Sequence, residues 1–214
     1  MDANYKYIDE TISRYPELGK IRGDIVSFCD ALIKAYSNKG KLLICGNGGS
    51  CADADHITGE LMKGFLKKRP LQDSLKTTLQ SIDKEDGEKI AQKLQMPLRA
   101  LNLYSLSALS SAFANDVDGD YVYAQLVLGL ADKNDVFVGI STSGNSGSVH
   151  KAAVTARAMG MVLIGMTGDD GGKMNGLYDI IIKVPENVTY KIQELHIPVY
   201  HAVCLTVEDY FFKE

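Results

Sequence analysis

Residues 41–60 read KLLICGNGGSCADADHITGE, and this stretch decides the fold. A short apolar run at 41–45 is followed by a glycine-rich break, which predicts a buried strand that ends in a loop. The segment after the loop predicts a helix from about Ser50 to about Phe65. Strand, loop and helix in this order are typical of the crossover connection between two parallel strands.

The same alternation recurs along the rest of the chain. Three further short runs rich in β-branched residues predict strands, at 135–140, 161–166 and 178–184. Helices are predicted at 18–37, 148–160 and 187–212. We therefore expect one α/β domain over residues 1–214, with a parallel sheet covered by helices on both faces. A helical segment over residues 1–38 precedes the first strand, and a long C-terminal helix ends the domain.

The segment 71–102 breaks this pattern, because it is charged and helix-forming and shows no clear strand. A stretch of this length between a helix and the next strand is longer than a crossover connection needs. We interpret it as a helical insertion or a lid.

Composition narrows the class of function. The formal net charge is −4, and apart from KGFLKKR at 63–69 the lysines are scattered, so no basic footprint for nucleic acid is present. The four cysteines form no C-x-x-C pair, and the N-terminus lacks the pattern of a signal peptide. No apolar run approaches the roughly 20 residues that cross a bilayer. We expect small-molecule chemistry in the cytoplasm, without a membrane or nucleic-acid partner.

Three loops follow the predicted strands, at 46–50, 141–147 and 167–173, and all are rich in Gly, Ser, Thr or Asn. Ligands of parallel α/β sheets bind at this carboxyl edge. The stretch STSGNSGS at 141–148 precedes a helix, where backbone N–H groups and small hydroxyls can hold a phosphate without a lysine. The alternative is a serine N-cap with a flexible turn.

His56 and Glu60 lie four residues apart on the predicted helix and therefore share one face. Such a pair can bind one metal ion, or place a carboxylate base beside an imidazole. The alternative is an ordinary contact at a surface or an interface.

The last helix carries three polar side chains in an otherwise apolar stretch: Gln193, His196 and His201. We interpret His196 as a core histidine. Eight residues separate Gln193 from His201, about 12 Å along a straight helix. Either the helix bends near Pro198, or one of the two side chains serves a neighbouring subunit. A further pair, Asn115 and Asp116, falls in a turn-like stretch before another helix, where such residues are most often caps.

Taken together, these motifs resemble the sugar isomerase (SIS) domain family, and within it the phosphoheptose isomerases. The motifs that carry the resemblance span residues 41–205 in the family's order, and they are CGNGGS, DADHITGE, ANDVDGD, GISTSGNSGSV, TGDDGGKM and IQELHI with His201. The resemblance implies a three-layer α/β/α fold with a five-stranded parallel sheet. It also implies a homotetramer with its active sites at subunit interfaces.

The resemblance further assigns roles to residues that match the family's motifs. It implies substrate contacts from Asn47, Gly48, Gly49, Glu60, Asn115, Asp116, Ser141, Thr142, Ser143, Ser146 and Gln193. It implies one zinc ion per subunit, held by His56, Glu60, Gln193 and His201. Glu60 and His201 are the implied acid/base pair. The implied reaction interconverts sedoheptulose 7-phosphate and D-glycero-D-manno-heptose 7-phosphate through an enediol, for heptose-containing surface glycans.

The chain departs from the family pattern at three places. Gly64 stands where members often have an arginine, and Tyr190 stands where they often have an aspartate. Lys63 or the lysines and arginine at 67–69 can supply the missing positive charge. The segment 71–102 is more than two dozen residues longer than the usual connection. These departures favour an alternative function, a non-catalytic SIS protein that binds a sugar phosphate or a replication-initiator-type partner as a regulator.

Overall fold

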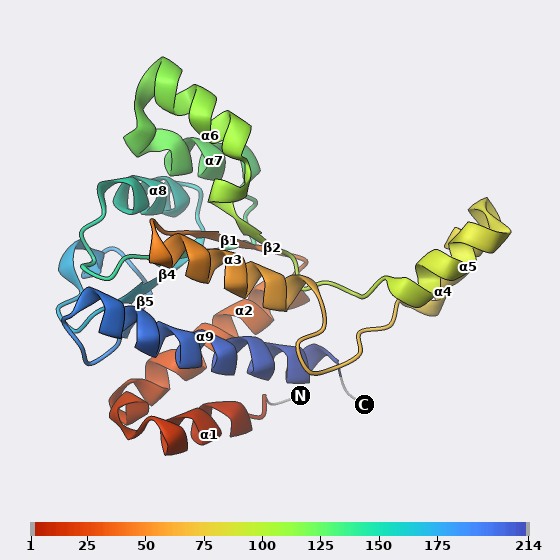
Figure 1. Cartoon of the computed structure of the whole chain (residues 1–214), viewed down its shortest axis with the longest axis horizontal. Coiled ribbons are helices and arrows are strands. Elements are labelled where there is room, and N and C mark those ends of the chain that lie inside the picture. The colour runs from red at the N-terminus through yellow and green to blue at the C-terminus, as the bar shows by residue number, and fades with distance from the viewer. Residues whose placement is uncertain (1–2, 213–214) are drawn as a thin grey trace.

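The computed structural model describes residues 3–212 as an α/β fold built on one five-stranded sheet (Figure 1). Every strand pair is parallel, and the order across the sheet is β2-β1-β3-β4-β5. The strands span Leu42–Cys45 (β1), Ala100–Asn102 (β2), Val136–Ile140 (β3), Val162–Thr167 (β4) and Ile180–Lys183 (β5). The predicted parallel sheet is confirmed, and so are the four strands that the apolar runs predicted.

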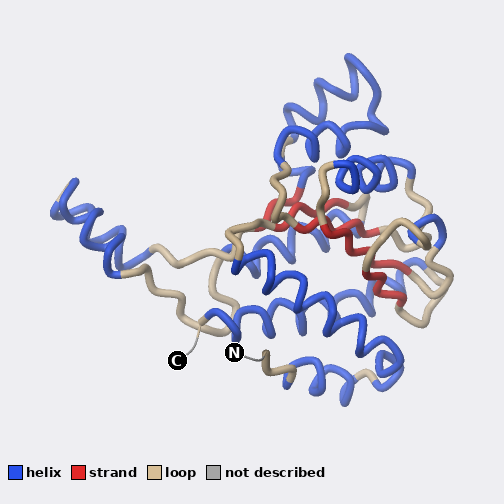
Figure 2. Tube along the Cα trace, turned by 180° about the vertical axis from the view of Figure 1, so that it is seen from behind, coloured by secondary structure: helices blue, strands red, loops and turns tan. Residues whose placement is uncertain are grey.

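Two helical layers cover the sheet, with α2, α3 and α9 on one face and α7 and α8 on the other (Figures 1 and 2). The helices span Lys6–Arg14 (α1), Arg22–Ser37 (α2), Gly49–Met62 (α3), Ser107–Phe113 (α6), Val122–Leu130 (α7), Gly147–Ala158 (α8) and Thr189–Phe211 (α9). Side chains along β1 alternate between the layers: Leu42 and Ile44 join the first core, and Leu43 and Cys45 join the second. The predicted three-layer arrangement is confirmed.

The N-terminal segment differs in detail from the prediction of one helix over 18–37. It contains α1, then a 3₁₀ turn at Pro16–Ile21, and α2 begins only at Arg22. Leu18 and Ile21 in that turn are buried in the same core as α2 and α9. Because these two residues are buried like those of a helix, their spacing in sequence looked like the start of α2. Pro16 instead begins a separate 3₁₀ turn.

The expectation that residues 71–102 contain no strand is wrong at their end. Ala100–Asn102 forms β2, the edge strand, and pairs with residues 42–44 of β1. Three residues that include an asparagine are too short to show an alternation in sequence. The helical part of the prediction is confirmed by α4 (Asp73–Ile82) and α5 (Lys84–Lys93).

Helices α4 and α5 form a hairpin arm that projects from the body of the molecule (Figure 1). No residue of α4 is buried, and Gly87 is the one buried residue of α5, packed against the Leu79 carbonyl where the helices approach. The two loop segments that connect the arm to the body lie side by side, because the Met96 N–H donates to the Arg69 carbonyl at 2.7 Å. The arm thus begins and ends at nearly one point of the body.

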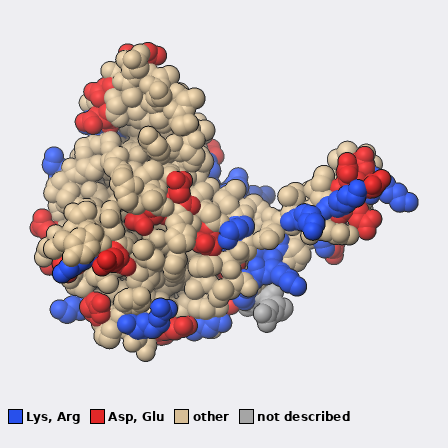
Figure 3. Space-filling view, viewed as in Figure 1, with Lys and Arg blue, Asp and Glu red and all other residues tan. Residues whose placement is uncertain are grey.

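The surface carries charges of both signs. On the face drawn in Figure 3, acidic and basic side chains are interspersed over the body and the outer arm, and Lys and Arg gather at the root of the arm. Within residues 3–212, no helix combines the length and the apolar character that a membrane span requires.

A buried ion pair joins the end of α3 to α9. Glu208 accepts hydrogen bonds from Arg69 Nε at 2.8 Å and from the backbone N–H groups of residues 65–67. The guanidinium also donates to the carbonyls of Leu61, at 2.6 Å, and Glu60, at 3.1 Å. Both charged side chains are 1% exposed or less. The pair satisfies helix-end carbonyls and loop N–H groups that would otherwise be buried without partners.

Removing the arm is expected to leave the body folded. Replacement of residues 73–94 by a short Gly-Ser linker should change the free energy of unfolding by less than about 1 kcal/mol, because the deleted helices bury almost nothing against the body. Urea unfolding of the two proteins measures this difference. A loss of several kcal/mol would show that the body depends on the arm.

Breaking the buried pair is expected to be costly. Arg69→Met leaves Glu208 buried without its counter-charge and should lower the free energy of unfolding by about 3–5 kcal/mol. The matched control is Arg157→Met, whose exposed pair with Asp179 should contribute less than about 1 kcal/mol. Equal effects of the two substitutions in urea unfolding would contradict this assignment.

Candidate active site

The loops that follow β1 and β3 meet at the carboxyl edge of the sheet, as predicted. Asn47 Nδ2 donates to Ser146 Oγ at 3.0 Å and to Ser148 Oγ at 3.1 Å. The Tyr123 hydroxyl, on α7, donates to the Gly46 carbonyl at 2.6 Å and so holds the loop after β1 against α7. Gly48 has a φ of 55°, a backbone conformation that favours glycine.

The serine loop, residues 141–146, leads directly into α8. Ser146 occupies the N-cap position but makes no capping hydrogen bond, and its hydroxyl is engaged by Asn47 instead. The loop is held to β4, because Gly168 N–H donates to the Thr142 carbonyl at 3.0 Å. The hydroxyl of Ser146 therefore does not cap α8, in contrast to the alternative that the sequence left open. Small hydroxyls beside the start of a twelve-residue helix are suited to an anion.

Asn115 and Asp116 are not hydrogen-bonded to the serine loop through their side chains within the described residues. They occupy a π-helical turn, Ala114–Asp118, rather than the turn-like stretch that we predicted. Asn115 Nδ2 donates to Asp116 Oδ1 at 2.9 Å, and both side chains are exposed. Among the described residues they make no side-chain hydrogen bond to the loops after β1 or β3.

His56, Glu60 and His201 form a cluster where α3 and α9 pack together. His56 Nε2 lies 3.5 Å from Glu60 Oε1 and 3.4 Å from His201 Nε2. Lys63 Nζ lies 3.2 Å from the other carboxylate oxygen of Glu60. The prediction that α3 presents His56 and Glu60 on one face is confirmed, and α9 brings the distant histidine to the same point.

Gln193 lies outside this cluster within one chain. A Cβ added at Gly49 would come within 2.5 Å of Gln193 Nε2, so this side chain packs against the start of α3. The two helices run side by side in the same direction: Gln193 faces Gly49, and eight residues later His201 faces His56. Helix α9 continues without a break through Pro198. Hence Gln193 and His201 stay about two turns apart.

The donor set of the cluster suits zinc, but the cluster is not closed. Two imidazole nitrogens and a carboxylate are common zinc ligands, and a tetrahedron with bonds of 2.0–2.1 Å has edges of about 3.3–3.4 Å. The two distances at His56 Nε2 are close to such edges. Within residues 3–212, however, no three His, Cys, Asp or Glu side chains already surround a common point as a metal site.

Burial shifts the pKa values around the cluster. The pKa of His201 is lowered, chiefly because the ring is partly buried and secondly because His56 lies beside it, and Glu60 opposes the shift. Burial raises the pKa of Asp53, one turn before His56, to about 6, although the Tyr200 hydroxyl stabilises its charged form. Both the burial of His201 and the neighbouring His56 therefore disfavour its charged form.

Two residues that the sequence analysis did not single out belong to this site. The Tyr200 hydroxyl lies 3.0 Å from His56 Nδ1 and donates to Asp53 Oδ1 at 3.3 Å. The available signals were local: Asp53 precedes His56 by three residues and so shares its helix face, and Tyr200 directly precedes His201.

His196 is fully buried on the sheet side of α9, as predicted for a core histidine. Its Nε2–H donates to the Thr167 carbonyl at 3.3 Å, and Nδ1 has no partner among the described residues. Burial lowers its pKa to about 4.

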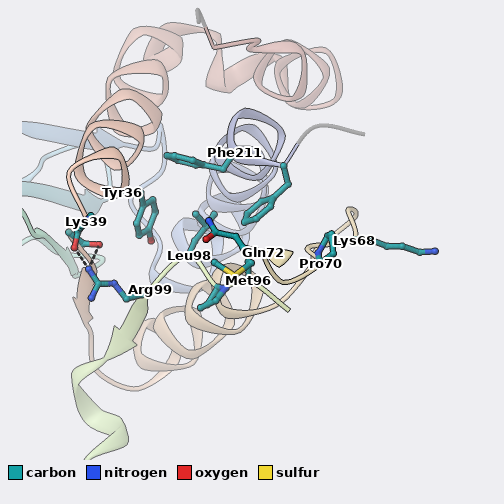
Figure 4. A pocket seen from close by; sticks show the side chains of 12 residues that line it. Tyr36, Lys39, Lys68, Pro70, Gln72, Met96, Leu98, Arg99 and Phe211 are labelled. Carbon is teal, nitrogen blue, oxygen red and sulfur yellow. Dashed lines mark hydrogen bonds between the residues drawn. The ribbon is translucent and has the colours of Figure 1, made fainter. Parts of the chain in front are cut away.

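A separate cavity lies at the root of the arm (Figure 4). It has a volume of about 790 Å³, and Tyr36, Leu98 and Phe211 line its walls. None of the predicted site residues lines it. A smaller cleft of about 150 Å³ between α1 and α9 does include His201, with Arg14 on the opposite helix.

The chain is similar to known proteins in sequence and in fold. A family model described as SIS domain matches residues 89–168. The chain is 42% identical to a phosphoheptose isomerase of Helicobacter hepaticus over 179 residues, 84% of this chain and 78% of that protein. Among solved structures, it is similar to the phosphoheptose isomerase GmhA of Neisseria gonorrhoeae, with a TM-score of 0.73, 31% identity and 94% of each chain covered. A phosphoheptose isomerase of Francisella tularensis gives a TM-score of 0.73 at 26% identity, with 95% of each chain covered.

The buried His196 is expected to make stability depend on pH. Its folded pKa of about 4 lies below the ordinary histidine value of 6.5, so the unfolded state takes up the proton first and stability falls as the pH decreases below 6.5. Between about pH 7.5 and about pH 5 this contributes about 2 kcal/mol.

The variant His196→Gln lacks this ionisation. The difference in unfolding free energy between wild type and variant should shrink by about that amount over the same range, as measured by urea unfolding. Asp53 acts in the opposite direction in this window, because its pKa is raised, but it is present in both proteins and cancels. A difference that stays constant with pH would contradict a neutral buried His196.

Proposed function

Because the chain belongs to the phosphoheptose isomerase family of SIS-domain proteins, we propose that it interconverts sedoheptulose 7-phosphate and D-glycero-D-manno-heptose 7-phosphate. The observation that carries the proposal is the cluster of Glu60 and His201 around His56, which puts a carboxylate and a second imidazole within 3.5 Å of one ring nitrogen. This chemistry would supply a precursor of heptose-containing surface glycans.

The reaction moves one proton between two carbons and one between two oxygens. In the ketose-to-aldose direction, the Glu60 carboxylate removes a proton from C1, and an enediol forms. His201 moves a proton from O1 to O2, and the proton held by Glu60 returns to C2 to give the aldose. A neutral imidazole suits this role, because one ring nitrogen can accept a proton while the other donates one, and burial lowers the pKa of His201 in that direction.

We propose that the serine loop binds the phosphate of the substrate. Ser141, Thr142, Ser143 and Ser146 surround the start of α8, and Asn47 ties this loop to the glycines of the β1 loop. Gly48, Gly49 and Gln193 lie between that loop and the histidine cluster, where the sugar chain would extend. The length of a heptose phosphate suits a site with its phosphate at one end and its reacting carbons at the other.

A zinc ion is part of the proposal. His56, Glu60 and His201 would hold it, with Gln193 as the fourth ligand from the family pattern, and the ion would polarise the carbonyl and stabilise the developing oxyanion. Binding to a metal would weaken the Glu60 carboxylate as a base, so its roles as a ligand and as the base would compete. Lys63 Nζ lies 3.2 Å from the second oxygen of Glu60, so an ion pair partly balances the charge of this carboxylate.

A homotetramer is also proposed. Within one chain, Gln193 stays two turns from His201, and Asn115 and Asp116 make no hydrogen bond to the serine loop. A site assembled from two copies would bring such residues together. The four cysteines are unpaired, in keeping with the cytoplasmic location that we predict.

The activity is tested by incubating the purified protein with sedoheptulose 7-phosphate, with and without zinc, and following aldose formation. Turnover is expected, and Glu60→Gln should reduce it by about 10²–10⁴-fold, because the amide cannot take the proton. Binding of the sugar phosphate to Glu60→Gln, measured by calorimetry, should stay within a few-fold of wild type.

The matched control is Glu88→Gln on the exposed arm, which should leave turnover unchanged. Absence of turnover in wild type under both conditions would contradict the isomerase function. Sugar-phosphate binding without turnover would favour the non-catalytic alternative.

A further inference from the structure

Behind the histidine cluster lies a short chain of hydrogen bonds that the proposed reaction does not use. Asp53 Oδ1 accepts from the Tyr200 hydroxyl at 3.3 Å, and the Tyr200 oxygen lies 3.0 Å from His56 Nδ1. Asp53 is 8% exposed and Tyr200 is 1% exposed, so water competes little for these contacts. The other ring nitrogen of His56 faces Glu60 and His201.

The direction of these hydrogen bonds follows from counting protons. An ionised carboxylate only accepts, and Asp53 Oδ2 is buried without any partner, so the Tyr200 hydroxyl is the one side-chain donor to this group among the described residues. If Tyr200 gave its single proton to His56 instead, both oxygens of Asp53 would be buried and unpaired, which is costly. Tyr200 therefore donates to Asp53 and accepts from His56 Nδ1–H.

We propose that Asp53 and Tyr200 are positioning residues that keep a proton on Nδ1 of His56, so that the lone pair of Nε2 points into the cluster. The tautomer of a histidine is set by the hydrogen bond that its other nitrogen makes. The same arrangement of a carboxylate behind a histidine orients metal-binding imidazoles in many proteins.

This arrangement leaves the cluster rich in lone pairs. His56 Nε2 and Glu60 Oε1 lie 3.5 Å apart and both are acceptors, so no hydrogen bond joins them. His201 Nε2–H can donate one hydrogen bond to His56 Nε2, at 3.4 Å, and the carboxylate charge is only partly balanced by Lys63. Such a cluster favours a cation. The binding of a cation rests on the proposed function, whereas the tautomer of His56 does not.

Tyr200 also allows a clean test, because its ring and its hydroxyl do different things. The ring packs edge-on against both histidines, with centroids 5.4 Å from His56 and 5.1 Å from His201. Tyr200→Phe keeps this packing and removes only the hydroxyl. Asp53→Ala removes the acceptor and frees the Tyr200 proton to bond with His56 Nδ1. Both changes should move the His56 proton to Nε2.

The first measurement is the ¹⁵N NMR spectrum of the histidine rings in the metal-free protein, with the His56 signals assigned by their loss in His56→Asn. Wild type should show His56 protonated on Nδ1, and Tyr200→Phe and Asp53→Ala should show a shift of the proton to Nε2. Tyr210→Phe is the matched control on the same helix, since the Tyr210 hydroxyl makes no hydrogen bond within residues 3–212.

The second measurement is zinc binding, followed by competition with a chromophoric chelator. Loss of the orienting hydrogen bonds should weaken zinc binding by about 10–100-fold in Tyr200→Phe and in Asp53→Ala, and Tyr210→Phe should bind as wild type does. Circular dichroism confirms that each variant is folded before it is compared.

A wild-type His56 with its proton on Nε2 overturns the proposal without any variant. An unchanged tautomer together with unchanged zinc affinity in both variants overturns it as well. If instead the tautomer moves as expected but wild type does not convert sedoheptulose 7-phosphate, the proposed function fails and the role of Asp53 and Tyr200 stands.

Discussion

The buried ion pair between Arg69 and Glu208 sets the position of α3 relative to α9, and the candidate site depends on that relation. Arg69 binds the last carbonyls of α3, including the carbonyl of Glu60 itself, and Glu208 lies on α9 two turns beyond His201. This ion pair, which solvent does not reach, therefore helps to fix the distance between Glu60, the proposed base, and His201, the proposed proton carrier. A surface ion pair could not do this, because water screens it and its side chains stay mobile.

The parallel course of α3 and α9 explains which site residues meet. Equivalent steps along two parallel helices keep the same partners opposite each other, so Gly49 meets Gln193 and His56 meets His201. A Cβ at Gly49 would come within 2.5 Å of the Gln193 amide, so a larger residue at this position would require the amide to shift. The same geometry keeps Gln193 away from His56, Glu60 and His201, the other residues that we propose as zinc ligands.

The parts of the fold that were predictable are those with strong periodicity. The apolar runs of β1, β3 and β4 are almost entirely buried, and β5 is partly buried, so all four stand out in sequence. The positions of the serine and glycine loops follow from the ends of these runs. The edge strand β2 was missed, because three residues carry no pattern. The π-helical turn at Ala114–Asp118 was missed too, since Asn and Asp favour several turn types. Among site residues, the pair of His56 and Glu60 was readable from its spacing, whereas the partnership of Asp53 with Tyr200 spans 147 positions and needs the tertiary structure.

The narrow attachment of the arm has a consequence for how the chain folds. β1 must find β2 across the whole arm, a separation that would slow pairing if the intervening chain were a flexible loop. The hairpin of α4 and α5 is local, and helical hairpins form faster than strands pair over long distances. Once it has formed, the Arg69 carbonyl and the Met96 N–H are already close, so the two ends behave as if joined by a short connection. The arm can thus shorten the search for the edge strand rather than lengthen it.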